Sequence, residues 1–164
     1  MKREYDDLIF RSAAVKSLPY DWRVWWAQIR QESQFDRMAR SPVGALGLAQ
    51  IMPATWRQWA EKAGYQGYDQ TDPEASLMTG ALYMRHLWGQ WSSPRPEMDR
   101  ICLAMASYNA GLGNILKAQK LANMATDYKS IIAKLPDVTG NKNAHETITY
   151  VKRILGYYAE EITG

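Results

Sequence analysis

The sequence lacks the features that stabilise or anchor a small protein by means other than packing. Its 164 residues include one cysteine, Cys102, so no disulfide can form within the chain. Because Cys102 lies in the apolar run ICLAMA, we expect it in the core and not in catalysis. No run approaches the ~18 apolar residues of a membrane-spanning helix, so stable membrane insertion is not expected. The length suits one compact domain over residues 1–164.

Strong charge of one sign is also absent. The net charge is +3, and the basic residues are scattered and not clustered, so a nucleic-acid partner is not expected. This small excess would suit a polyanionic partner such as cell wall, or would serve only solubility. His145 and Glu146 begin like the zinc motif HExxH, but no second histidine completes it, so we expect no metal. The first residues, MKREYDDLIF, lack the apolar core of a signal peptide.

No segment alternates apolar and polar residues as a half-buried strand does, and almost every periodic segment has helical spacing. We therefore predict an all-α domain of seven to nine helices. The expected helices cover 3–16, 21–33, 54–63, 73–91, 97–109, 114–125, 128–135 and 144–162, with a loop at 136–143. Asp21 is a predicted N-cap, and Pro53, Pro73 and Gly64 are predicted helix boundaries.

Phenylalanine is scarce, whereas tryptophan and tyrosine are abundant. The chain has 2 Phe against 7 Trp and 10 Tyr. Trp and Tyr combine a flat apolar face with a polar tip, which suits sugar stacking in wet clefts. A Trp-rich helical core explains the same composition, and the sequence leaves both possibilities open.

One carboxylate lies on the apolar line of a predicted helix. Glu32 follows Trp25, Trp26 and Ile29 at helical spacing, near the end of the segment 21–33. Burial and the negative end of the helix dipole both disfavour its charged form, so we expect a raised pKa. A protonated acid in an apolar cleft can protonate a glycosidic oxygen. The alternative is a helix-end glutamate that points to solvent.

The segment SPVGALGLAQIMP after this helix contains glycines suited to a tight turn that could line a cleft. Gly44 and Gly47 permit backbone angles and close approaches that other residues resist. Gln50 lies among apolar residues and needs hydrogen-bond partners, in a ligand or in the protein itself. Tyr108 ends another apolar stripe, where its phenol could reach the same cleft or cap the core.

Four motifs, taken in order, resemble those of the soluble lytic transglycosylase family. They are ES at Glu32–Ser33, SPVGALGLAQIMPAT at 41–55, SYNAG at 107–111 and ETITYV at 146–151. The resemblance covers nearly the whole chain and implies a single compact goose-lysozyme-like helical fold with a glycan-binding groove. The chain departs from the family's GLMQ at Ala49, which removes a flexible apolar contact and is expected to alter glycan positioning.

The resemblance also implies which residues act. Glu32 would be the sole catalytic acid and base, cleaving the β-1,4 bond between N-acetylmuramic acid and N-acetylglucosamine. The sugar's own 6-hydroxyl would attack and leave a 1,6-anhydro end. The implied substrate-binding residues are Ser41, Gln50, Met52, Tyr108, Asn109 and Glu146. The expected partners are peptidoglycan glycan strands, and the expected protein is a monomer without cofactor.

Two other functions stay open. A hydrolytic muramidase would normally use a second carboxylate, and Asp36, Asp69 and Asp72 lie in loops without a distinguishing pattern. A catalytically silent peptidoglycan-binding or virion-structural module is the other. For the setting, we expect action in the periplasm or cell wall. A bacteriophage endolysin released from the host cytoplasm through a holin, or a virion-borne lysin, fits a chain without a leader. A bacterial secretion-system lysin or a processed periplasmic enzyme also fits.

Overall fold

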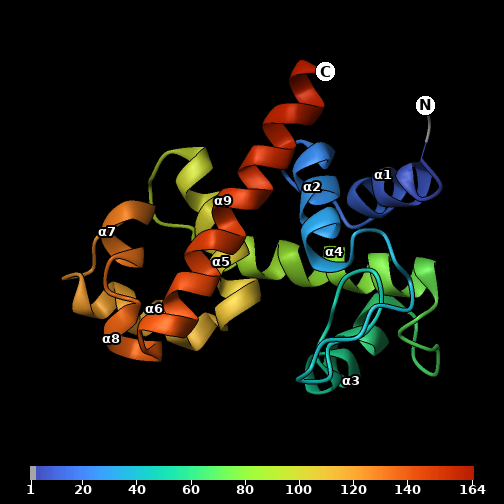
Figure 1. Cartoon of the computed structure of the whole chain (residues 1–164), viewed down its shortest axis with the longest axis horizontal. Helices are drawn as coiled ribbons and strands as arrows, with labels where there is room; N and C mark the ends of the chain where they lie inside the picture. Colours follow the sequence, from blue (N-terminus) through green and yellow to red (C-terminus); the bar gives the residue numbers. More distant parts are fainter. Residues whose placement is uncertain (1–2) are drawn as a thin grey trace. The chain divides into compact units, whose positions relative to one another are not determined.

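The computed structural model describes residues 3–164 and confirms the predicted all-α fold class. The helices are α1 (Asp6–Val15), α2 (Trp22–Ser33), α3 (Pro53–Ala63), α4 (Pro73–Gln90), α5 (Glu97–Ala110), α6 (Leu112–Leu121), α7 (Tyr128–Ile132), α8 (Pro136–Thr139) and α9 (Asn141–Thr163) (Figure 1). Strand-like pairing in this range is limited to two isolated antiparallel bridges, which join Arg40 to Leu46 and Leu46 to Ile51. None of the described helices is long and apolar enough to cross a membrane.

The chain divides into two compact units. Residues 3–85 and 154–164 belong to unit 1, and residues 86–153 belong to unit 2. Two of the helices, α4 and α9, therefore contribute residues to both units. The single domain over residues 1–164 stays a prediction.

In unit 1, two tryptophans of α2 bind this helix to α1. Trp25 and Trp26 are fully buried, and each indole N–H has a partner on α1. Trp25 Nε1 donates to Ser12 Oγ at 3.0 Å, and Trp26 Nε1 donates to Asp6 Oδ1 at 3.0 Å. Buried donors that are satisfied in this way fix the register of two packed helices. These two tryptophans therefore belong to the core.

The predicted helix boundaries in unit 1 are confirmed. Asp21 is the N-cap of α2 and accepts the backbone N–H of Arg23 at 3.0 Å. The Arg23 side chain and the Tyr158 hydroxyl also donate to this carboxylate, and hydrogen bonding to Arg23 lowers the pKa of Asp21 despite partial burial. Pro53 opens α3, and Gly64 ends it in the left-handed conformation.

Unit 2 is built around α5, where seven consecutive residues, Ile101–Ser107, are buried. The helices α6 and α7 both pack against α5, and α6 also contacts α7 and α8 (Figure 1). Trp91 Nε1 donates to Ser107 Oγ at 3.0 Å, which satisfies another buried indole. Cys102 is buried, and desolvation raises the pKa of its thiol to about 12. This confirms core packing, because a thiol that holds its proton is a poor nucleophile.

Two details of the C-terminal region differ from the prediction. The predicted loop 136–143 contains the short helix α8, which begins at Pro136, and α9 begins at Asn141. Proline at the first helical position favours a helix start, and Gly140, with φ of 87°, separates the two helices. The predicted buried line of α9 was Ile148, Val151, Leu155, Tyr158 and Ile162, but only Val151 of these is buried. The buried residues of α9 are Ala144, Thr147, Tyr150, Val151 and Ile154. Small and polar residues on a buried face give a weak apolar signal.

Candidate active site

Glu32 lies in the last turn of α2, where its side chain is half-buried. The next residue, Ser33, is buried and donates its hydroxyl to a carbonyl of the preceding turn at 3.2 Å. The helix then ends abruptly, because Gln34 and Phe35 have left-handed φ values of 52° and 64°. Two consecutive non-glycine residues in this conformation cost free energy, and such strain is often found beside functional side chains.

The strained turn after Glu32 is held by packing. The ring centroid of Phe35 lies 5.2 Å from that of Trp26, the buried indole of α2. Aromatic pairs at this separation contribute about 0.5–1.5 kcal/mol beyond the area that they bury. The core of unit 1 thus offsets part of the strain next to the predicted catalytic residue.

The segment 39–51 folds into a compact loop, as the two glycines predict. Gly47 donates its N–H to Ala39 O at 2.9 Å and has a φ of 85°. A Cβ at Gly47 would lie 2.2 Å from the carbonyl oxygen of Gln70, which leaves no room for a side chain. Outside the loop, Ser76 Oγ accepts the Ala49 N–H at 3.1 Å, and Gln70 Nε2 donates to a loop carbonyl at 2.8 Å. The loop is therefore held in unit 1 by the close approach of Gly47 to Gln70 and by the hydrogen bonds of the Ser76 and Gln70 side chains.

Two predicted substrate contacts, Ser41 and Gln50, form hydrogen bonds within this loop. Ser41 Oγ accepts the Ala45 N–H at 2.9 Å. Gln50, with a φ of 48°, donates Nε2 to Ala39 O and Gly47 O, both at 2.9 Å. These bonds give Gln50 the structural role that the sequence left open. A contact of Gln50 with substrate would use its acceptor oxygen, Oε1.

Met52 and Ala49 lie near each other in sequence but in opposite environments. Met52 precedes α3 and is 41% exposed, so this residue is available on the surface. Ala49 has no exposed surface, and a Cβ built on Gly80 of α4 would lie 2.9 Å from the Ala49 Cβ. Ala49 therefore faces the core and cannot contact a glycan. The expected effect of Ala49 on glycan positioning stays a prediction.

In unit 2, one hydrogen bond joins the last two motifs. Asn109, at the end of α5, accepts the Thr147 hydroxyl at its Oδ1 at 2.7 Å. Thr147 is buried on α9 and follows Glu146, whose side chain is exposed. Tyr108 is half-buried in the last turn of α5. The structure thus brings the SYNAG and ETITYV motifs together within this unit.

Thr147 is a structural partner that the prediction missed. A threonine on a buried helical line needs a hydrogen-bond acceptor, and this requirement was the available signal. This signal was missed because the predicted buried line of α9 passed through Ile148, whereas the structure buries its neighbour Thr147. Of the seven predicted site residues, Glu32, Ser41, Gln50 and Met52 belong to unit 1, whereas Tyr108, Asn109 and Glu146 belong to unit 2.

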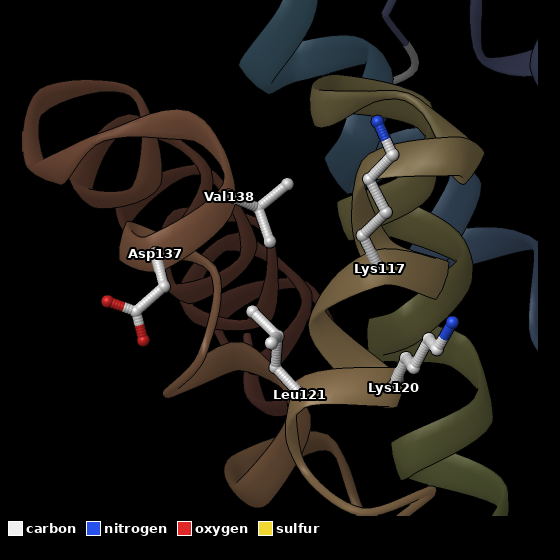
Figure 2. Close-up of a pocket in the computed structure, with 5 residues that line it drawn as sticks. All are labelled: Lys117, Lys120, Leu121, Asp137 and Val138. Carbon is white, nitrogen blue, oxygen red and sulfur yellow. The ribbon is translucent and has the colours of Figure 1, made fainter.

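A hollow of about 620 Å³ in unit 2 lies apart from the predicted residues of that unit. Figure 2 shows Leu121 of α6 and Val138 of α8 facing each other across it. Lys117, Lys120 and Asp137 complete the lining, with no predicted site residue among them. Within residues 3–164 no group of three or more His, Cys, Asp or Glu side chains is placed to hold a metal ion.

Comparison with known proteins identifies the family. The family model described as the Transglycosylase SLT domain matches residues 12–131. The chain belongs to this family of lytic transglycosylase enzymes. This SLT domain carries six of the seven predicted site residues within the matched range, and Glu146 lies beyond it. The family resemblance predicted from the motifs is therefore confirmed.

Several relatives resemble this SLT domain. Membrane-bound lytic murein transglycosylase F of Maricaulis maris is 33% identical over 161 residues, which are 90% of this chain and 34% of the relative. The enzyme of the same name from Serratia proteamaculans is 34% identical over 163 residues, which are 90% of this chain and 32% of the relative. The chain thus spans about a third of the length of the curated relatives that it matches.

Solved structures agree with this placement. The 70 kDa soluble lytic transglycosylase Slt70 of Escherichia coli is similar over 98% of this chain and 24% of its own, with a TM-score of 0.75 and 30% identity. A lytic transglycosylase Slt from Pseudomonas aeruginosa is similar over 98% of this SLT domain and 24% of its own chain, with a TM-score of 0.76 and 26% identity. That structure is of an inactive mutant in which glutamine replaces a glutamate.

Proposed function

We propose that this SLT domain is a lytic transglycosylase that cleaves peptidoglycan at the bond between N-acetylmuramic acid and N-acetylglucosamine. The observation that carries the proposal is the family match over residues 12–131, which includes the predicted acid, Glu32. The murein transglycosylase names of its relatives support peptidoglycan as the substrate. The inactive glutamate-to-glutamine mutant of the Pseudomonas aeruginosa enzyme supports a role for a glutamate in catalysis.

The chemistry needs one carboxyl group that changes its protonation state during the cycle. Glu32, as an acid, donates its proton to the leaving glycosidic oxygen, and the bond breaks through an oxocarbenium-like state. The Glu32 carboxylate then takes the proton of the sugar's 6-hydroxyl, whose oxygen forms the 1,6-anhydro bond. The proton is therefore returned, and no water is consumed. The substrate's own N-acetyl group assists, so the protein needs no nucleophile.

The surrounding residues have supporting roles in this proposal. Met52 offers an exposed apolar surface to the glycan, and Gln50 offers Oε1 as an acceptor. Ser41 keeps the loop closed through Ala45 and can also meet the substrate at its hydroxyl. In unit 2, we propose Tyr108, Asn109 and Glu146 as further glycan-binding residues.

Replacement of Glu32 by Gln tests the assignment. Glu32→Gln keeps the size and shape of the side chain but replaces one carboxyl oxygen by a non-titrating NH₂ group, so murein cleavage should fall about 10²–10⁴-fold. Release of soluble muropeptides from purified sacculi measures this rate, and binding to sacculi should persist. Glu97→Gln makes the same replacement at an exposed residue of α5 and is the matched control, with cleavage expected at the unaltered rate. If Glu32→Gln cleaves sacculi at the rate of the unaltered chain, the assigned acid is wrong.

The biological setting is a separate prediction. We propose action on the cell wall, with a phage endolysin or virion-borne lysin as the specific setting. Holin or virion genes beside the coding sequence would support the phage setting, whereas a bacterial operon would indicate a bacterial enzyme instead. Monomeric behaviour is likewise predicted, and analytical ultracentrifugation measures it.

A further inference from the structure

Unit 1 contains a second hollow, whose lining begins at Trp56, four residues after the predicted site residue Met52. It has a volume of about 400 Å³ and lies between one face of α3 and the turn that follows this helix. We call it the α3 pocket, and its lining includes Trp56, Arg57, Ala60, Glu61, Gln66 and Tyr68. Trp56 and Ala60 are four residues apart on α3, as are Arg57 and Glu61, so each pair projects from one side of the helix.

The turn that closes the α3 pocket is well defined. Tyr65 donates its N–H to Ala60 O at 2.8 Å, which completes the helix end at Gly64. Tyr68 donates its N–H to Tyr65 O at 3.1 Å, and Gly67 has the positive φ, 84°, that this turn requires. The rings of Tyr65 and Tyr68 meet edge to face at 5.1 Å. Tyr68 is therefore held in place although it is 53% exposed.

The polar groups around the α3 pocket are not used by the protein. Between residues 3 and 164, five of the lining residues form no side-chain hydrogen bond or ion pair: Trp56, Arg57, Glu61, Gln66 and Tyr68. The buried indoles of Trp25 and Trp26, in contrast, both donate to partners in the core. An indole, a guanidinium and an amide supply donors here, and a carboxylate supplies acceptors.

These groups match the chemistry of one ligand class. An aromatic face packs against the apolar C–H face of a pyranose ring, while planar polar side chains bind its hydroxyl groups. Arg57 and Glu61 have opposite charges, so the α3 pocket suits a neutral sugar. An N-acetyl group presents a carbonyl acceptor and an N–H donor together, which Arg57 and Glu61 can pair. The hollow in unit 2 is lined by lysine, aspartate and aliphatic side chains and has no aromatic face (Figure 2).

We propose that the α3 pocket is a binding site for N-acetylglucosamine units of a glycan strand. The identity of that strand as peptidoglycan rests on the proposed function, but binding of the sugar does not. The site would hold the wall polymer at contacts additional to those of the seven predicted residues. It also gives Trp56 and Tyr68 a sugar-binding role, whereas Trp25 and Trp26 belong to the core.

A titration followed by nuclear magnetic resonance tests this site directly. The ¹⁵N-labelled full chain is titrated with the tetramer of N-acetylglucosamine, and the side-chain signals of Trp56 Nε1–H and Gln66 Nε2–H₂ are followed. Both signals should shift along one saturable curve. Trp56→Ala, read at Gln66, and Tyr68→Ala, read at Trp56, should each raise the Kd about tenfold through lost stacking. Tyr68→Phe keeps the ring and should stay within about twofold of the unaltered chain.

The controls separate this site from the rest of the molecule. Leu121→Ala at the unit 2 hollow should leave the Kd unchanged, and the glucose tetramer cellotetraose should bind at least about tenfold more weakly because it lacks the N-acetyl group. The proposal is overturned if neither signal shifts, if both alanine variants keep the original Kd, or if cellotetraose binds equally well. Because the readout is binding at Trp56 and Gln66, failure of the Glu32→Gln test leaves this result unaffected, and the reverse also holds.

Discussion

The predicted site residues of unit 1 and those of unit 2 are positioned by different physical means. In unit 1 the loop 39–51 takes its shape from left-handed backbone at Gly44, Gly47 and Gln50, together with hydrogen bonds inside the loop. In unit 2 the corresponding residues lie on regular helices, and the hydrogen bond from Thr147 to Asn109 joins their two motifs. The first arrangement depends on backbone conformation, whereas the second depends on one side-chain contact between rigid helices.

This difference predicts where substitutions do most damage. A backbone that must turn against a neighbouring carbonyl tolerates no added atom, so one methyl group can disrupt the whole loop. A hydrogen bond between two helices can be lost while the helices keep their packing. Effects in unit 1 should therefore be larger than those in unit 2.

The largest effect is expected at Gly47. In Gly47→Ala the new Cβ would lie 2.2 Å from Gln70 O, and the φ of 85° is unfavourable for alanine. Strain and overpacking together should lower the free energy of unfolding by about 3 kcal/mol. Urea unfolding followed by circular dichroism measures the change. Gly44→Ala, where nothing lies within 4 Å of the added Cβ, is the matched control and should cost only about 1 kcal/mol. Equal losses would show that backbone contacts do not set the loop.

A smaller effect in the same loop is expected at Ala49. In Ala49→Met the longer side chain must enter space next to Gly80 that Trp25 already fills, since a Cβ built on Gly80 lies 2.9 Å from both Ala49 and Trp25. Overpacking should cost about 1–3 kcal/mol of unfolding free energy. Val43→Met adds volume to a residue of the same loop that is 74% exposed, and its effect should stay within about 0.5 kcal/mol. If Ala49→Met leaves the protein as stable as the unaltered chain, the buried placement of Ala49 is contradicted.

The smallest effect belongs to the helix-to-helix contact of unit 2. Thr147→Val keeps the shape of the side chain but removes the donor to Asn109 Oδ1, which should cost about 0.5–1.5 kcal/mol. Thr147→Ser keeps the hydroxyl and should restore the bond at the expense of one methyl group. Urea unfolding measures the change in stability, and the nuclear magnetic resonance shift of the Asn109 side-chain amide reports whether the hydrogen bond is present. If Thr147→Val destabilises the protein more than Gly47→Ala does, the contrast between the units is wrong.

The same contrast explains what could be predicted from the sequence. Helical spacing and boundary residues such as Asp21, Pro53 and Gly64 were enough to place most helices, because these signals are local. The motifs identified the family, and Gly44 and Gly47 indicated a turn. The sequence indicated that the Gln50 amide needs partners, but the partners themselves could not be foreseen, because they depend on how the loop closes on itself. The buried side chain of Ala49 could not be foreseen either, because it depends on a residue distant in sequence, Gly80.

The α3 pocket could not be predicted from the sequence either. Trp56, Gln66 and Tyr68 form no motif, and they meet only because Gly64 and Gly67 turn the chain back toward α3. The tryptophan and tyrosine content raised sugar stacking and a Trp-rich core as equal possibilities. The structure places Trp25, Trp26 and Trp91 in the core, whereas Tyr68 is exposed and is available for the proposed sugar contact.

The most direct test of the central claim follows the oxygen atom at the cleaved bond. The claim is that Glu32 acts both as the acid that donates a proton and as the base that takes one up. The sugar's 6-hydroxyl, and not water, then attacks the sugar at the cleaved bond. Murein sacculi are digested with the protein in ¹⁸O-enriched water, and the masses of the products are measured by mass spectrometry. The account predicts anhydro ends that carry no ¹⁸O and no new reducing group. One ¹⁸O atom and one reducing end for each bond cleaved would contradict it and identify a hydrolytic muramidase.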